Sequence, residues 1–89
     1  MLTVKRIVLD VLKPHHPNGL DFAQAIAEQC PACRVTLTVS EMDEKTETLV
    51  LVIEGEDLHY EAISDSIAAM GASVHSIDEV AVENRDEPA

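Results

Sequence analysis

Apolar and polar residues alternate along four stretches of the chain, and this period of two is typical of β-strands. In the first stretch Ile7, Leu9 and Val11 fall on one face, and we expect Lys13-Pro14 to end the strand. A short polar segment, 42–46, separates the second stretch from the third, so these two strands are predicted to form an antiparallel hairpin. The four predicted strands are residues 3–12, 34–42, 47–54 and 73–82.

Two further stretches carry apolar residues at helical spacing, one after the first strand and one after the third. Asn18 is a candidate N-cap for a helix over residues 20–29. Asp57 is the corresponding candidate for a helix over residues 58–70, and Gly71 stands where a left-handed C-cap is needed.

The order strand–helix–strand–strand–helix–strand, with right-handed crossovers, predicts an α+β domain of the ferredoxin-like βαββαβ type. Its four-stranded antiparallel sheet has the spatial order 4-1-3-2, with both helices on one face. We expect one domain over residues 1–82 and a flexible acidic C-terminal tail over 83–89.

The other face of this sheet is rather apolar for a surface in contact with water. Val8, Val50, Val52 and Met42 are predicted to lie there among threonines and serines. Because exposed apolar patches mark interfaces, we expect a homo-oligomer.

Strand directions bring several metal-ligating residue types to one end of the sheet. The group consists of Asp10, His15, Asp43, Glu47 and His75. Converging carboxylates favour a hard divalent cation, Ca²⁺ first and Mg²⁺ second, whereas participating imidazoles would shift the preference towards Zn²⁺. The alternative interpretation is a solvated turn with ordinary loop histidines.

Two other motifs suggest different chemistry. Cys30 and Cys33 have the spacing of a redox dithiol or of half a second metal site, but they follow a helix C-terminus, where the helix dipole does not favour a thiolate. Asn18-Gly19 precedes a helix N-terminus and loosely resembles the small-molecule loop of ACT regulatory domains. These motifs give two alternative functions: a dithiol redox protein, and a regulatory module that binds a small metabolite at a subunit interface.

The formal net charge of −11 argues against nucleic acids and acidic membranes as partners. The chain has no phosphate-binding glycine loop and no nucleophile elbow, so we expect a non-enzymatic protein. No apolar run approaches the roughly 20 residues of a membrane span, and no signal region is evident at the N-terminus. We therefore expect a cytoplasmic protein that associates with itself.

Three segments in combination resemble a known family, the small, mainly archaeal proteins called domain of unknown function 211. They are Val8-Leu-Asp-Val-Leu-Lys-Pro-His15, Met42-Asp-Glu-Lys-Thr-Glu47 and Val74-His-Ser-Ile-Asp-Glu-Val80. The resemblance implies a ferredoxin-like fold, homo-oligomeric assembly and divalent-cation binding, with no established activity. It adds Asp78 and Glu79 to the polar positions of interest. The Cys30–Cys33 pair and the doubled His15-His16 depart from the family pattern.

Overall fold

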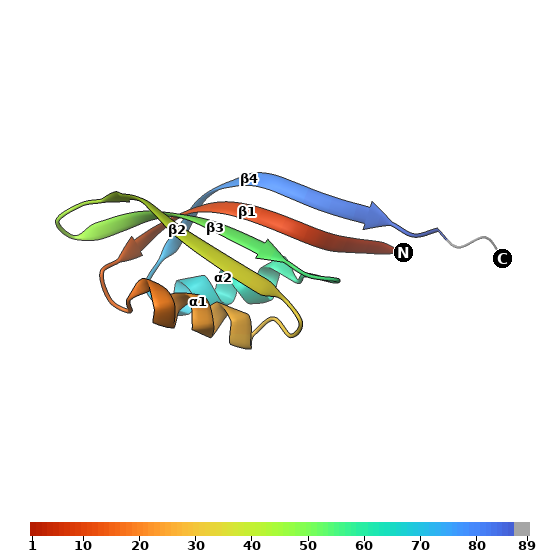
Figure 1. Cartoon of the computed structure of the whole chain (residues 1–89), viewed down its shortest axis with the longest axis horizontal. Helices are drawn as coiled ribbons and strands as arrows, with labels where there is room; N and C mark the ends of the chain where they lie inside the picture. The colour runs from red at the N-terminus through yellow and green to blue at the C-terminus, as the bar shows by residue number, and fades with distance from the viewer. Residues whose placement is uncertain (87–89) are drawn as a thin grey trace.

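The computed structural model describes residues 1–86 and has the predicted α+β architecture. The elements are β1 (Leu2–Pro14), α1 (Gly19–Glu28), β2 (Arg34–Met42), β3 (Thr46–Glu54), α2 (Tyr60–Ala69) and β4 (Ser73–Asn84). The strands form one antiparallel sheet in the order β2-β3-β1-β4, which is the predicted order read from the opposite edge. Both helices lie against the same face of the sheet (Figure 1). The ferredoxin-like fold is thus confirmed.

The core lies between the sheet and the two helices, and the strand alternation selects its residues. Leu9 and Val11 of β1 are fully buried, as are their partners Leu51 and Leu49 in β3. The helices contribute the remaining large side chains, namely Phe22, Ile26, Ile63 and Ile67. Burial of these aliphatic groups is the main favourable contribution to folding.

Two of the three predicted helix caps are confirmed. The Asn18 side chain accepts a hydrogen bond from the Asp21 amide at 2.9 Å, and Gly71 has a φ of 81°. The prediction for Asp57 is wrong, because α2 begins only at Tyr60. The reason lies at Leu58, whose side chain is buried and whose N–H donates to the Val4 carbonyl at 2.9 Å, so the chain is still paired with β1 at this point.

The first and last strands extend further than predicted. Lys13 and Pro14 do not end β1 but continue it, opposite Glu47 and Thr46 of β3. At the other end of the chain β4 runs to Asn84, two residues into the predicted tail. Residues 87–89 of that tail lie outside the part described.

The pairing of β1 with β4 is interrupted three times by an extra residue. The register of the two strands leaves Lys5 of β1 and His75 and Asp78 of β4 without a directly opposite partner. Such β-bulges change the direction in which a side chain points. Two of the bulged residues, Lys5 and His75, line hollows on the protein surface.

The exposed apolar side chains are not confined to the sheet face where the sequence predicted them. On the sheet face away from the helices, hereafter the open face, Val8, Val50 and Val52 are half-buried. The prediction that Met42 joins them there is wrong: an irregularity in β2 after Val39 places Met42 opposite Glu47 on the helix-side face, where it is strongly exposed. Further exposed apolar side chains lie on the β1–β4 ribbon, which extends past the helices (Figure 1): Leu2, Ile77, Val80 and Val82. Among residues 1–86 there is no helix with the length and hydropathy needed to cross a membrane.

Candidate functional site

The five predicted metal-site residues divide between two places on opposite faces of the sheet. Glu47 lies on the helix-side face and contacts His15, which in turn reaches the β2–β3 hairpin loop containing Asp43. Asp10 and His75 line a hollow on the open face instead. Within residues 1–86, no three His, Cys, Asp or Glu side chains come close enough together to hold a metal ion.

Glu47 is paired with a lysine that lies fully inside the protein. The strand alternation that buries Leu9 and Val11 also directs Lys13 inward, and its side chain has no exposed surface. Its ammonium group donates to the Pro14 and Pro17 carbonyls at 2.7 and 2.6 Å and lies 3.2 Å from Glu47 Oε1. All three N–H groups of the ammonium therefore have an acceptor, as a buried charge requires.

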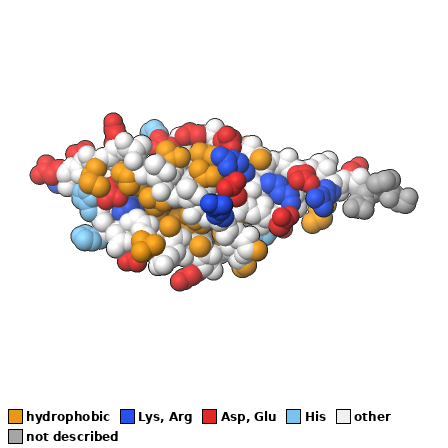
Figure 2. All heavy atoms as spheres, in the orientation of Figure 1, with side chains coloured by type: hydrophobic (Ala, Val, Ile, Leu, Met, Phe, Trp, Pro, Cys, Tyr) orange, Lys and Arg blue, Asp and Glu red, His pale blue; other side chains and the backbone are white. Residues whose placement is uncertain are grey.

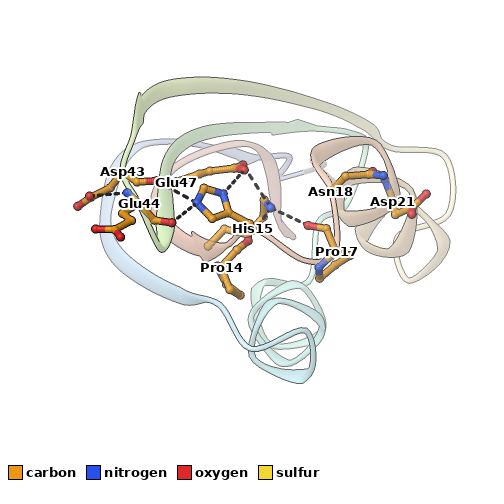
Figure 3. Close-up of polar contacts among 9 residues, drawn as sticks. Pro14, His15, Pro17, Asn18, Asp21, Asp43, Glu44 and Glu47 are labelled. Carbon is orange, nitrogen blue, oxygen red and sulfur yellow. Dashed lines mark hydrogen bonds and ion pairs between the residues drawn. The ribbon is translucent and has the colours of Figure 1, made fainter.

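His15 occupies the space between Glu47 and the hairpin loop (Figure 3). Its Nδ1 lies 3.0 Å from Glu47 Oε2, and its Nε2 lies 2.9 and 3.0 Å from the carbonyl oxygens of Asp43 and Glu44. Every one of these partners is an acceptor, so the arrangement fits the doubly protonated imidazolium. The hydrogen bond to Glu47 raises the pKa of His15, and the same bond, with the Lys13 charge, lowers the pKa of Glu47.

This Lys13–Glu47–His15 cluster connects three parts of the chain, and its chemistry does not fit a metal ion. An ammonium group already neutralises Glu47, and both nitrogens of His15 face acceptors. The Asp43 carboxylate accepts a hydrogen bond from the Glu44 amide at 2.6 Å and contributes only its backbone carbonyl to the cluster. The cluster instead fastens the hairpin loop to the segment that follows β1.

Asp10 and His75 come together because of a β-bulge. Asp10 on β1 lies opposite Ser76, and Val11 lies opposite Val74, so the register skips His75. The skipped residue lines the same hollow of about 260 Å³ as Asp10, together with Leu12 and Thr48. A carboxylate from β1 and an imidazole from β4 thus border one space on the open face, with the Thr48 hydroxyl as an additional oxygen.

The cysteine motif forms a turn with little reactive character. Cys30 is buried, Cys33 is half-buried, and the Cys33 amide donates to the Cys30 carbonyl at 3.2 Å. Burial, with a smaller contribution from the neighbouring Cys30, raises the pKa of the Cys33 thiol to about 12. Because the thiolate is the reactive species, this environment works against dithiol chemistry.

The Asn18-Gly19 motif serves the helix that follows it. The Asn18 side-chain oxygen caps α1, and a Cβ at Gly19 would lie 3.4 Å from Leu37 Cδ2, so this residue packs against β2. These contacts account for both residues without a ligand.

Two positions from the family resemblance also have structural partners. Asp78 accepts a hydrogen bond from the Ser76 hydroxyl at 2.7 Å. Glu79 pairs with Arg6, which also contacts Glu54 at 3.0 Å.

The residue that sequence reasoning missed is Lys13. Its place in the alternating series 7, 9, 11, 13 is the signal that could have identified it as inward-facing.

Comparison with known proteins gives consistent results. Residues 5–85 match the family DUF211, described as "Uncharacterized ArCR". The chain is also 42% identical over 77 residues to "Uncharacterized protein MJ0319" of Methanocaldococcus jannaschii, a match that covers 86% of this chain and 79% of that protein. The chain therefore belongs to the DUF211 family.

Proposed function

We propose that this protein is a non-enzymatic homo-oligomer that binds a divalent cation on the open face of its sheet, through Asp10 and His75. The observation that carries the proposal is the bulge that turns His75 into the hollow beside Asp10. Bulges occur preferentially next to functional sites, where they redirect a side chain.

The number of donors in one chain supports an assembly in which copies share the cation. Asp10, His75 and Thr48 supply three side-chain groups, whereas Zn²⁺ takes four ligands and Ca²⁺ six to eight. A second copy packed on the open face would double the set. A carboxylate combined with an imidazole suits Zn²⁺ or a similar transition metal better than Ca²⁺ or Mg²⁺.

The surroundings of Asp10 support the same arrangement. On the open face its neighbours include Val8 and Leu12 of its own strand and Val50 of β3. A second copy covering this band would remove water from the Asp10 carboxylate, and burial of an unpaired charge is costly. A bound cation would offset that cost, so cation binding and assembly would be coupled.

Native mass spectrometry of the purified protein with added Zn²⁺, Ca²⁺ or Mg²⁺, before and after chelation, tests this proposal. The expected result is one preferred cation whose removal reduces the oligomeric state. Asp10→Asn and His75→Gln should each weaken its binding by at least about tenfold, because even the loss of a residue that only orients a ligand costs that much. The matched controls Asp65→Asn and His16→Gln remove the same groups elsewhere and should leave binding unchanged. Equal binding by all four variants would overturn the assignment of the site.

A further inference from the structure

A second hollow, of about 400 Å³, lies at the other end of the β1–β4 pair and contains none of the residues discussed so far as cation ligands. It is lined by Met1, Thr3, Lys5, Glu56, Asp57 and Arg85. In the view of Figure 2, Lys and Arg side chains lie from the middle of the molecule towards this end, with acidic groups between them, whereas acidic and His side chains are prominent at the hairpin end.

The backbone explains why a hollow forms here. β3 ends at Glu54, and the loop that follows takes its place beside β1: the Gly55 amide donates to the Lys5 carbonyl at 3.0 Å and the Leu58 amide to the Val4 carbonyl at 2.9 Å. On the other side of β1, the Arg85 amide donates to the Met1 carbonyl at 2.9 Å. The start of β1 therefore forms a floor between two flanking segments.

The two flanking segments carry opposite charges. Glu56 and Asp57 form an acidic wall, and Arg85 forms a basic one. Lys5 points into the hollow from the floor at the bulge in β1, and its ammonium lies 2.9 Å from the Glu56 carboxylate. The hydrogen bond from Lys5 lowers the pKa of Glu56 most, followed by the Lys5 charge and, to a smaller extent, the Arg85 charge. The cations of the hollow therefore act on its acidic wall.

These charged groups are available to a ligand at little cost. The Glu56 side chain is 87% exposed, and Arg85, whose nearest partner is Glu83 at 2.7 Å, is 69% exposed. Exposed ion pairs contribute little net stability, so a ligand's own charges can replace them. Beside the charges, Met1 and the Thr3 methyl group offer apolar surface, the combination usual in small-molecule sites.

We propose that this hollow binds a zwitterionic small molecule of the amino-acid class, with its carboxylate towards Lys5 and Arg85, its ammonium towards Glu56 and Asp57, and an apolar side chain against Met1. A simple anion would pair with the basic side of the hollow and leave the acidic wall without a partner. A simple cation would do the reverse. The site and its ligand are independent of the cation proposal, because the two hollows share no residue.

Titration of the ¹⁵N-labelled full chain with L-leucine, followed by amide chemical shifts, tests the proposal. Saturable shifts are expected at Thr3, Lys5, Glu56, Asp57 and Arg85. N-acetyl-leucine amide, which lacks both charges, should produce none, and N-acetyl-leucine and leucinamide, which each lack one, should bind more weakly than leucine. Lys5→Gln and Arg85→Gln should each weaken leucine binding by about tenfold, as for loss of one charge-assisted hydrogen bond. Arg34→Gln, which removes a cation from outside the hollow, is the matched control.

Three outcomes would overturn the proposal: no saturable shift at these residues, equal binding of the uncharged analogue, or undiminished binding in both the Lys5 and Arg85 variants. All of these variants alter exposed or half-exposed side chains, and the spectrum itself reports whether each remains folded. Because no metal is added, the result does not depend on the Asp10–His75 site.

Discussion

His15 and Glu47 face each other at 3.0 Å, and the remaining ring nitrogen of His15 faces two backbone carbonyls of the hairpin loop. With acceptors on both sides, the ring can donate to Glu47 and to the hairpin loop at the same time only when it carries two protons. The Glu47 carboxylate must be ionised at the same time, because it also faces the Lys13 ammonium. The contact therefore depends on two groups that titrate in different pH ranges.

We predict that stability is greatest between about pH 4.5 and 6.5, the ordinary pKa values of the two groups. The folded-state pKa of His15 is raised, so its contribution is complete below pH 6.5 and is lost as the pH rises through the folded value. The folded-state pKa of Glu47 is lowered, so its contribution is complete above pH 4.5 and is lost as the pH falls through the folded value. Urea unfolding at pH values below, within and above this range measures both effects.

The variant His15→Gln distinguishes the alkaline-side loss of stability, which comes from His15, from the acid-side loss, which comes from Glu47. It should flatten the loss of stability on the alkaline side, while His16→Gln, which alters the neighbouring exposed histidine, should retain that loss. If the two variants gave the same profile, His15 would not be the group responsible. Hydrogen exchange at Lys45 and Thr46 should accelerate above the His15 midpoint in the wild-type chain, because the hairpin loop loses its attachment.

Replacement of Lys13 by methionine should be strongly destabilising, although methionine is apolar and similar in length. It would leave the nearly buried Glu47 carboxylate with His15 as its remaining partner, and the Pro14 and Pro17 carbonyls would lose the Lys13 donor. Removing one member of a buried pair costs about 3–5 kcal/mol in the free energy of unfolding. Denaturant unfolding should also show that the double variant Lys13→Met/Glu47→Leu is more stable than Lys13→Met alone. The opposite order would mean that Lys13 acts mainly through packing on Phe22, over whose ring its ammonium lies at 5.9 Å.

Cys33 should react slowly with iodoacetamide at neutral pH. Its pKa of about 12 leaves almost no thiolate, so the alkylation rate of the folded protein should keep rising with pH well beyond the unperturbed midpoint of about 8.5. Mass spectrometry of the alkylated peptide gives the rate at each pH, with the urea-unfolded chain as the reference. A plateau near pH 9 in the folded protein would contradict this environment and restore the dithiol interpretation.

Gly55→Ala should destabilise the protein by about 1–3 kcal/mol, the usual range for overpacking. An added Cβ would lie 2.9 Å from Leu58 Cδ2, 3.3 Å from Cys33 Cβ and 3.4 Å from the Ala32 carbonyl, so the cysteine turn would have to move. Gly19→Ala is the matched control, since its Cβ would meet only the Leu37 side chain, at 3.4 Å or more. Thermal unfolding of the two variants should separate them clearly, and equal midpoints would show that the turn adjusts without cost.

The sequence predicted the fold well because strand and helix periods identify which side chains face the core. Ile7, Leu9, Val11 and their β3 partners are buried as that period requires. It also predicted which end of the sheet His15, Asp43 and Glu47 occupy. It did not separate Asp10 and His75 from them. The alternation does place Asp10 on the face opposite Leu9 and Val11, but the direction of His75 depends on a bulge that the sequence does not reveal. Lys13 was missed because a charged residue before a proline is usually a strand end, and only tertiary pairing with Glu47 makes its burial tolerable.

The bulges in β4 also restrict how the sheet can grow. β4 is an edge strand of 12 residues, and a long regular edge is a template for addition of another strand. His75 and Asp78 interrupt the row of outward-facing backbone groups in the first half of β4, so the uninterrupted stretch is Glu79–Asn84. Along this edge of the sheet, strand-to-strand association between copies, including the uncontrolled kind that leads to aggregation, is thereby confined to a segment of about 20 Å.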